Sequence, residues 1–409
     1  MLYGREKFIG MVIVTLLLSP LMAKAQGNGS VDLSGDMLPA ERWGVRLESR
    51  FGIATNRYDE HGKEVGVADE LDNIDINADL LSVLSIFGAG ASLGVTDVSS
   101  TIKSLRERLF IGYGVSERVT LVSMLPWAEV RNEVDFDVTP GDLALNPAFD
   151  PTQPVSAGNL PFVAAGAVGP ASAADINKLL TEPVYGYEYK PIESVTTSGF
   201  QDPEFYLRWL AYQGDGKRLI LTPGIRLGMS ENDDPDNFLD VRLYNGSDDI
   251  MMRFDYSQRL MPALDAQLTY RHTWQLMDHR RARALAEGES LVSANRKERM
   301  ERDLGDVDEV MLEARYRHDA WRYRVRLSYQ NKKQDNWTSP SGQDVRGLEQ
   351  DTDRIYQHYW LGLTWNGVSA WRDGAMPLPL IIAFDYRDVY KGKNVLKSKD
   401  YYLTLTVMF

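Results

Sequence analysis

Apolar and polar residues alternate with a period of two in several separate segments of the chain. In the last nine residues, one face carries Tyr401, Leu403, Leu405, Val407 and Phe409, and the other carries Tyr402, Thr404 and Thr406. The pattern recurs at 42–53, 218–229, 263–275 and 321–330. A helix face repeats every three to four residues, so strict alternation predicts β-strands. Strands with one apolar and one polar face are typical of a membrane-spanning barrel around an aqueous lumen.

Adding the weaker segments predicts an all-β fold: a transmembrane antiparallel up-and-down β-barrel of about 12 strands. The strands are expected at 42–53, 102–113, 118–130, 200–212, 218–229, 249–259, 263–275, 307–317, 321–330, 354–365, 378–390 and 401–409. Each is near the roughly 9–11 residues that a tilted strand needs to cross a bilayer. Several links are tight, as periplasmic turns are, whereas those near 54–101, 131–199 and 276–306 are long, as extracellular loops are. The alternative is 14 strands, with an extra hairpin within 72–93.

The first 25 residues have the features of a signal peptide. Arg5 and Lys7 are followed by an apolar stretch, and Ala23 to Ala25 forms a small-x-small cleavage site before Gln26. We therefore expect export through the Sec pathway. The predicted organisation is a signal peptide at 1–25, a periplasmic N-terminal segment at 26–41 and a barrel at 42–409.

Composition narrows the class of protein further. The chain has no cysteine, which excludes disulfides and cysteine-ligated metals, and beyond residue 25 it has no apolar run long enough for a membrane-spanning helix. Its formal charge of −13 argues against a nucleic-acid partner. The predicted location is the outer membrane of a Gram-negative bacterium. Expected partners are outer-membrane lipid and lipopolysaccharide, a small-molecule solute, and the barrel-assembly machinery, which would read the C-terminal signal formed by Tyr401, Leu403, Leu405, Val407 and Phe409.

The polar faces of the predicted strands are rich in arginine, and these residues are the candidates for lining the lumen. They are Arg42, Arg46, Arg50, Arg208, Arg226, Arg253, Glu309, Glu313, Arg322, Arg324, Arg326 and Arg387. An arginine on the lipid face near the midplane costs about 2–4 kcal/mol, which favours the inward orientation. Two interpretations remain open. Either the arginines form a pore that attracts anions, or they pair with carboxylates in a narrow barrel that conducts little.

The long loops suggest further features. The Ala- and charge-rich segment 279–303 could form a short helix over the mouth or fold inward, and the link 131–198 is long enough to constrict the barrel. Acidic clusters at 233–236 and at Asp72, Asp75 and Asp79 lack the complete calcium-loop pattern, so no metal site or cofactor is expected. No Ser-His-acid set is evident, and we expect no enzymatic activity.

Two segments resemble a known family. The runs LFIGYGVSERVTLVSMLPW at 109–127 and GFQDPEFYLR at 199–208 resemble the paired signatures of the outer-membrane family associated with the MetA pathway of phenol degradation, which is distantly similar to fatty-acid and aromatic-hydrocarbon uptake channels. The resemblance implies a channel for passive uptake of small solutes, anionic or aromatic. The alternative is a nonconducting surface barrel whose loops bind a partner or lipid.

Overall fold

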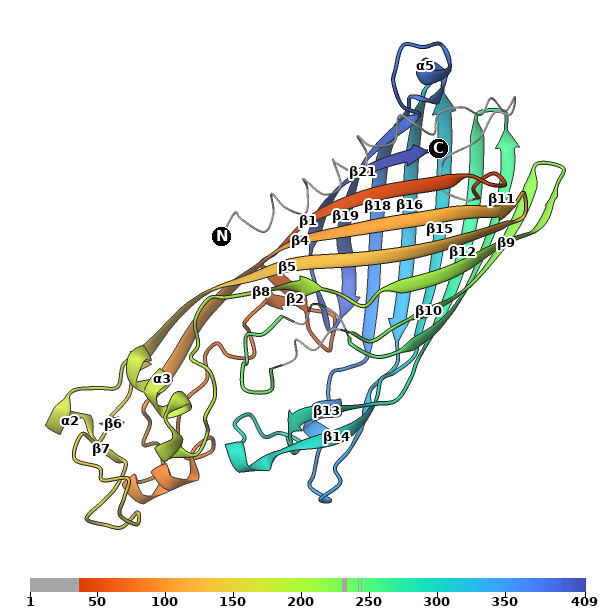
Figure 1. Ribbon diagram of the computed structural model, residues 1–409. Coiled ribbons are helices and arrows are strands. Elements are labelled where there is room, and N and C mark those ends of the chain that lie inside the picture. The colour runs from red at the N-terminus through yellow and green to blue at the C-terminus, as the bar shows by residue number, and fades with distance from the viewer. Residues whose placement is uncertain (1–36, 230–233, 242, 244) are drawn as a thin grey trace.

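Twelve antiparallel strands form a closed barrel in the computed structural model, which describes residues 37–229, 234–241, 243 and 245–409 (Figure 1). The barrel strands are β1 (Trp43–Ala54), β4 (Gly94–Ser116), β5 (Val119–Pro140), β9 (Glu204–Gly214), β10 (Lys217–Arg226), β11 (Asp249–Met261), β12 (Leu264–Gln275), β15 (Val307–His318), β16 (Trp321–Lys332), β18 (Arg354–Asn366), β19 (Leu380–Lys393) and β21 (Lys399–Met408). The predicted fold class and strand number are confirmed. The predicted signal peptide and residues 26–36 lie outside the described residues.

Each strand pairs with its neighbour in sequence, and the first strand closes on the last. Strand β1 pairs with β21 from Gly44 opposite Met408 to Ile53 opposite Lys399, and with β4 on its other side. Pairing of β4 with β5 completes the ring. Because strands alternate, residues such as Leu121, Leu207 and Leu312 point outward and are 40–55% exposed. This apolar exterior is the surface that a barrel presents to lipid.

The strand expected at 200–212 begins at Glu204, as β9, and a further short strand, β8 (Val195–Phe200), precedes it. Strands β8 and β9 both pair with β5 but are separated by residues 201–203. Pro203 and Pro126, the latter on the facing stretch of β5, have no N–H group to donate, so the ladder cannot continue between them. Instead Gln201 N–H donates to the Pro126 carbonyl at 2.9 Å, and Leu227 N–H donates to the Pro203 carbonyl at 3.0 Å.

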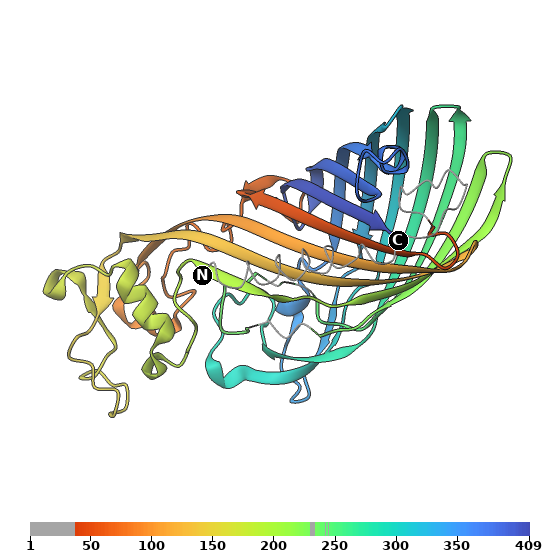
Figure 2. The same cartoon turned by 45° about the horizontal axis from the view of Figure 1, so that its top comes forward.

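Strands β4 and β5 continue well beyond their neighbours and support an extracellular lobe (Figures 1 and 2). The lobe is built from L1 (55–93) and L2 (141–194), and its buried core includes Leu84, Leu93, Phe162 and Leu179. Its helix α3 (Ala173–Thr181) begins with a capping box between Ser172 and Asp175, and Ile176, Leu179 and Leu180 lie on one buried face.

The structure of the lobe differs from two expectations about segments 72–93 and 131–198. Segment 72–93 contains the 3-10 helix η2 (Ser82–Phe87) and adds no strand to the barrel, so the 14-strand alternative is wrong. Segment 131–198 does not constrict the barrel. Its first ten residues extend β5, residues 141–194 fold into the lobe, which projects away from the barrel end, and residues 195–198 begin β8.

Small elements complete the loops. L1 holds β2 (Asn56–Tyr58) and β3 (Glu64–Gly66), which join β20 (Val395–Leu396), and L2 holds β6 (Leu143–Leu145), β7 (Phe162–Ala164), α2 (Ala165–Val168) and η3 (Pro183–Tyr185). L4 (276–306) forms the hairpin β13 (Asp278–Arg283) and β14 (Lys297–Asp303), with the 3-10 turn η4 (Ala294–Arg296) between them, so the first alternative for 279–303, a short helix over the mouth, is wrong. L5 (333–353) contributes β17 (Asn336–Thr338) and α4 (Arg346–Glu349), and α5 (Val368–Arg372) lies in a turn at the opposite end.

None of the helices in the described part of the chain is long and apolar enough to cross a membrane.

Candidate functional site

The inner wall of the barrel carries most of the predicted lumen residues. The strand register places Arg46, Arg50, Arg208, Arg226, Arg253, Glu309, Glu313, Arg322, Arg324, Arg326 and Arg387 on the inward face. Arg42 differs because it precedes β1, at the periplasmic rim, where its carbonyl accepts from Gly114 N–H at 2.9 Å. The alternation of residues along each strand therefore places charged side chains from seven strands around the lumen.

One network joins the first and last strands of the barrel. Asp400 on β21 accepts from Arg50 Nε of β1 at 2.8 Å and from Arg387 Nε and Nη2 of β19 at 2.8 and 2.5 Å. The Asp400 side chain is completely buried. The Arg387 guanidinium also lies 5.5 Å from the ring centre of Tyr356 and 5.7 Å from that of Trp360, within the range of cation–π attraction.

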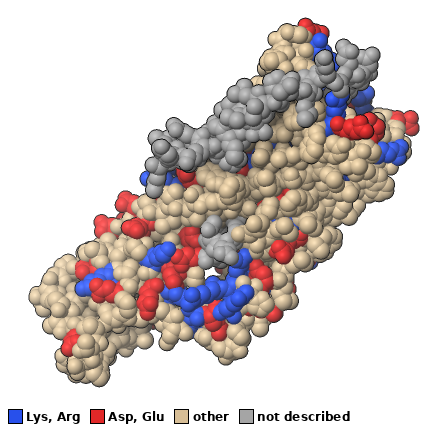
Figure 3. All heavy atoms as spheres, viewed as in Figure 1, with Lys and Arg blue, Asp and Glu red and all other residues tan. Residues whose placement is uncertain are grey.

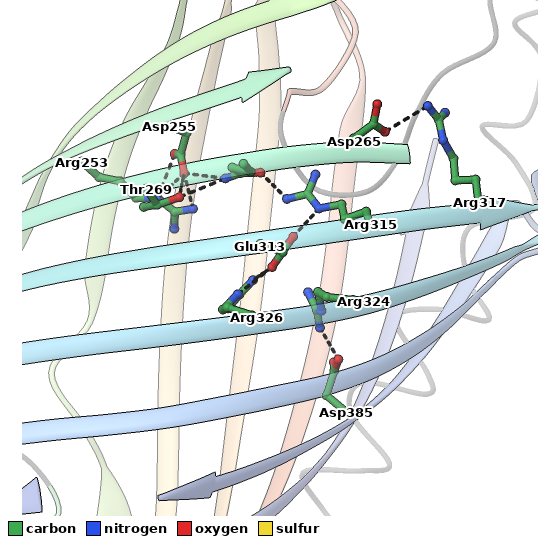
Figure 4. A network of polar contacts seen from close by, with 11 residues as sticks. Arg253, Asp255, Asp265, Thr269, Glu313, Arg315, Arg317, Arg324, Arg326 and Asp385 are labelled. Carbon is green, nitrogen blue, oxygen red and sulfur yellow. Dashed lines mark hydrogen bonds and ion pairs between the residues drawn. The ribbon is translucent and has the colours of Figure 1, made fainter. Parts of the chain in front are cut away.

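A second network crosses β11, β12, β15, β16 and β19 (Figure 4). Glu313 accepts from Arg326 Nε at 2.6 Å and also binds Arg315, which donates to Gln267. Gln267 in turn donates to Asp255, which binds Arg253 through contacts of 2.6–3.0 Å.

Further pairs extend this network. Arg324 binds Asp385 across β16 and β19, and Thr269 donates to Asp255 at 2.6 Å. Arg271 pairs with Glu309 at 2.7 Å. Each of these contacts joins different strands or links residues two positions apart on one strand. The charged side chains therefore stabilise the barrel wall as well as lining the lumen.

The extracellular end of the wall has a separate cluster. Arg226 on β10 binds Glu204 of β9 at 2.8 Å and also Asp249 of β11. All three side chains are at most 8% exposed. This cluster lies beside the break between β8 and β9 and fixes the strands that follow it.

The carboxylates lie against the wall, whereas the arginines reach toward the lumen. Side-chain exposure is 3% for Asp255 against 36% for Arg253, 4% for Asp385 against 24% for Arg324, and 3% for Glu313 against 21% for Arg326. In the two networks, five carboxylates bind seven arginines: Asp255, Glu309, Glu313, Asp385 and Asp400 bind Arg50, Arg253, Arg271, Arg315, Arg324, Arg326 and Arg387. The lumen surface that water can reach therefore carries more positive charge than the ratio of carboxylates to arginines alone would indicate.

Loop L3 (227–248), in the residues that the structure describes, narrows the extracellular end, a role that the sequence did not indicate. Leu243 packs against Ile102, Ala128 and Val130, which are on the inward faces of β4 and β5. Asn132 Nδ2 donates to the Leu239 carbonyl at 3.2 Å. L3 therefore lies inside the barrel mouth.

The buried carboxylate of Asp202 anchors L3 at both ends. Its two oxygens accept from Met229 N–H at 2.8 Å and from Gly246 N–H at 2.9 Å. Asp202 belongs to the 201–203 break in the wall, so the interruption between β8 and β9 and the attachment of L3 are one structural feature.

The periplasmic end is narrowed by residues before β1. Leu38 N–H donates to Thr120 Oγ1 on the inner wall at 3.0 Å. The Leu38 side chain fits where Gly44 and Gly112 face each other, because a Cβ at either glycine would lie 2.8 Å from it. Leu38 therefore occupies part of the lumen at this end.

Several charged residues of the wall were not among the predicted candidates. Arg106 and Arg108 face inward on β4, where they alternate with Leu105 and Leu109, so the period-two pattern was sufficient to find them. Asp400 was missed because the predicted last strand began one residue later.

The predicted insertion signal forms the end of β21. Tyr401 and Leu403 are 45% and 43% exposed on the outer face, which they share with Leu405 and Val407. Val407 is buried, and Phe409 follows the strand and exchanges two backbone hydrogen bonds with Trp43, at 2.9 and 3.1 Å.

The acidic clusters have structural partners. Asp72 accepts from Val98 N–H at 2.9 Å, Asp75 binds Ser92, and Asp236 binds Arg283 and Lys297. Asp233 lies outside the described residues. Among the residues that the structure describes, no group of three or more acidic, histidine or cysteine side chains could hold a metal ion.

No protein-family model matches the chain, and no curated protein matches its sequence. Among solved structures, the chain is similar to an outer membrane channel from Pseudomonas putida F1, with 12% identity, a TM-score of 0.53, and coverage of 93% of this chain and 100% of that chain. Less similar are a FadL homologue of Pseudomonas aeruginosa, with a TM-score of 0.32, 12% identity and 90% coverage of both chains, and the Ralstonia pickettii toluene transporter TbuX, with a TM-score of 0.34, 10% identity, and coverage of 91% of this chain and 90% of that one.

The first of these structures is similar enough to define the fold of this chain. The other two have TM-scores too low to support a conclusion about it. The chain thus has the fold of a bacterial outer-membrane β-barrel channel. The expected resemblance to outer-membrane channels is confirmed at the level of the fold.

Proposed function

We propose that this protein is a passive outer-membrane channel for small anionic solutes, inserted after export through the Sec pathway. The observation that carries the proposal is the unequal exposure within the lumen pairs. Each network carboxylate is almost buried, while its arginine partner reaches farther into the lumen. Fixed guanidinium groups concentrate anions in a pore, as rings of arginine do in anion channels.

The narrowing by L3 and Leu38 supports a restriction to small solutes. The similar Pseudomonas putida F1 protein is described as an outer membrane channel, which supports transport rather than catalysis. The aromatic rings of Tyr356 and Trp360 beside Arg387 would also favour an anion with a planar apolar part, because the rings offer a stacking surface next to the charge.

The proposal is tested by ion selectivity in planar bilayers. The double variant Arg253→Gln/Arg324→Gln removes two of the accessible lumen charges, so the reversal potential in a salt gradient should shift toward cation preference. The shift should shrink at 1 M salt, where the Debye length is about 3 Å. Arg131→Gln, on the outer face of the β5 extension, is the matched control and should leave selectivity unchanged.

Two results would contradict the proposal. Conductance with unaltered selectivity in the double variant would exclude the arginines as the lining of the pathway. No conductance from a wild-type barrel that is folded, as judged by heat modifiability on gels, would instead favour the nonconducting surface barrel.

A further inference from the structure

The hairpin of β13 and β14 in L4 carries an unusual concentration of positive charge for an acidic chain. Figure 3 shows lysine and arginine side chains gathered in the part of the molecule where Figure 1 places this hairpin. The two strands pair in antiparallel register, with Arg281 opposite Arg299, Arg283 opposite Lys297 and His279 opposite Glu301. Successive residues of a strand point to opposite faces, so these three pairs share one face of the hairpin.

The other face of the hairpin is structural. Met300 packs there with Ala284 and Trp337 in a small buried core. Arg302 and Arg280 pair with Asp278 at 2.6 and 3.2 Å and donate to carbonyl groups of L3. This face therefore attaches the hairpin to L3 and L5.

On the charged face, the pair nearest the connection between β13 and β14 also has binding partners within the protein. Arg283 and Lys297 both bind Asp236 of L3. The Arg283 guanidinium also lies 3.7 Å from the ring centre of Tyr189 and donates to backbone carbonyls of L2. One carboxylate thus serves two cations, which leaves an excess of positive charge beside the next pair.

That next pair is Arg281 and Arg299, and it is the exception. Both residues are exposed, and within the described part of the chain neither makes an ion pair, a hydrogen bond or a ring contact. Like charges directly opposite each other on neighbouring strands are destabilising. Glu301 lies on this face one pair farther along, and among the ion pairs of the described residues it has none with either arginine.

The spacing of the pair suits one bound anion. Directly opposite residues in an antiparallel pair have Cβ atoms about 4.5–5.5 Å apart, so both guanidinium groups can reach a single tetrahedral group. Arginine recognises phosphate through two parallel N–H···O bonds. A dianionic phosphoryl group would neutralise both charges and remove the repulsion between them.

The geometry points to a phosphoryl-binding site on L4, formed by Arg281 and Arg299 and supported by the excess charge of Arg283 and Lys297. Its ligand is a phosphorylated group at the extracellular surface, either free in solution or on a lipopolysaccharide headgroup. The site is separate from the lumen networks and does not require that the barrel conduct.

The site is tested by calorimetric titration of the full-length mature protein in detergent with pyrophosphate, at low salt. Wild-type protein should bind, and Arg281→Gln/Arg299→Gln should weaken binding at least tenfold. The variant Arg281→Lys/Arg299→Lys keeps both charges without the planar forks and should fall between the two. The control Arg131→Gln/Lys178→Gln removes two exposed cations outside L4, one on the β5 extension and one in the lobe, and should bind as wild type does.

A second measurement distinguishes the sources of the phosphoryl group. The temperature of the heat-induced gel shift is compared in phosphorylated and dephosphorylated lipopolysaccharide, with and without pyrophosphate. Protection of wild type but not of the Gln variant by phosphorylated lipopolysaccharide identifies a lipid ligand, and protection by pyrophosphate alone identifies a soluble one. The proposal is overturned if neither protects and titration shows no binding, or if the Arg131→Gln/Lys178→Gln control loses binding as much as the Arg281→Gln/Arg299→Gln variant does. The gel shift itself shows that each variant is folded.

Discussion

Replacing Glu313 by glutamine separates the two effects of the lumen network, which are support of the wall and charge of the pathway. Glu313 is 3% exposed and binds both Arg315 and Arg326. The glutamine side chain has nearly the same shape but carries no charge. The substitution therefore leaves two guanidinium groups in place without their carboxylate.

The expected loss of stability follows from this geometry. Removing one partner of a buried ion pair costs about 3–5 kcal/mol. Because Arg315 and Arg326 are 13% and 21% exposed, lumen water compensates part of the loss, and we expect about 3 kcal/mol. That corresponds to a change of about 100-fold in the folding equilibrium.

The expected change in selectivity has the opposite sense to that of an arginine substitution. The two networks would retain four carboxylates for seven arginines, so anion preference should increase at low salt, where the Debye length is about 30 Å, and the change should fade at 1 M. The assays are the gel-shift temperature and the reversal potential. Glu182→Gln in the lobe, whose contact with Lys178 is exposed, is the control and should alter neither quantity.

Two outcomes would refute this reasoning. An unchanged gel-shift temperature would mean that the network does not support the barrel. A shift toward cations would mean that Glu313 is not on the conducting side of the wall.

Three further predictions concern other parts of the chain. Phe409→Ser should lower the amount of assembled barrel without reducing export, as measured by fractionation and heat modifiability. Asp202→Asn should release one end of L3, since an amide nitrogen cannot accept the N–H groups now bound there, and should increase open-channel noise in bilayers. A hydrogen bond from Lys397 lowers the pKa of Glu64, so this contact between L1 and the residue that follows β20 should be fully present above the ordinary glutamate pKa and lost as pH falls through the lowered value. Lys397→Met should raise the pKa of Glu64 toward its usual value in an NMR titration of the carboxyl carbon.

The barrel could be predicted from sequence because lipid and lumen impose opposite polarity on successive residues. That constraint ends at the membrane surface. Strand β5 was expected to stop at Val130 but runs to Pro140, although Arg131 and Glu133 lie on the face that is apolar nearer the periplasm. The strand continues because those positions face water, where Lys103 pairs with Glu133 at 2.7 Å instead of meeting lipid.

The inward course of L3 was not visible in the sequence for a different reason. Leu239 and Leu243 belong, with Phe238 and Val241, to a short apolar run in an acidic loop, and their partners lie more than 100 positions earlier, on β4 and β5. Leu239, Val241 and Leu243 alternate with polar residues, but so short a pattern does not indicate which distant residues the segment contacts. The arginine networks were partly predictable, since alternation gives the face of each charge, but the pairing across strands depends on register, which alternation leaves undetermined.

The position of Asp400 has a consequence for assembly. Its partner Arg50 is 350 residues earlier in the chain, so the contact cannot form until the final strand is in place. Before that point the barrel is an open sheet with two unpaired edges, and Arg50 and Arg387 lack their shared carboxylate. The last strand therefore satisfies the backbone of both edges and neutralises the seam in a single step. A chain that ended ten residues early would lose both the backbone pairing of the two edges and the carboxylate of the seam. Its barrel would keep two unpaired strand edges that could pair with other molecules.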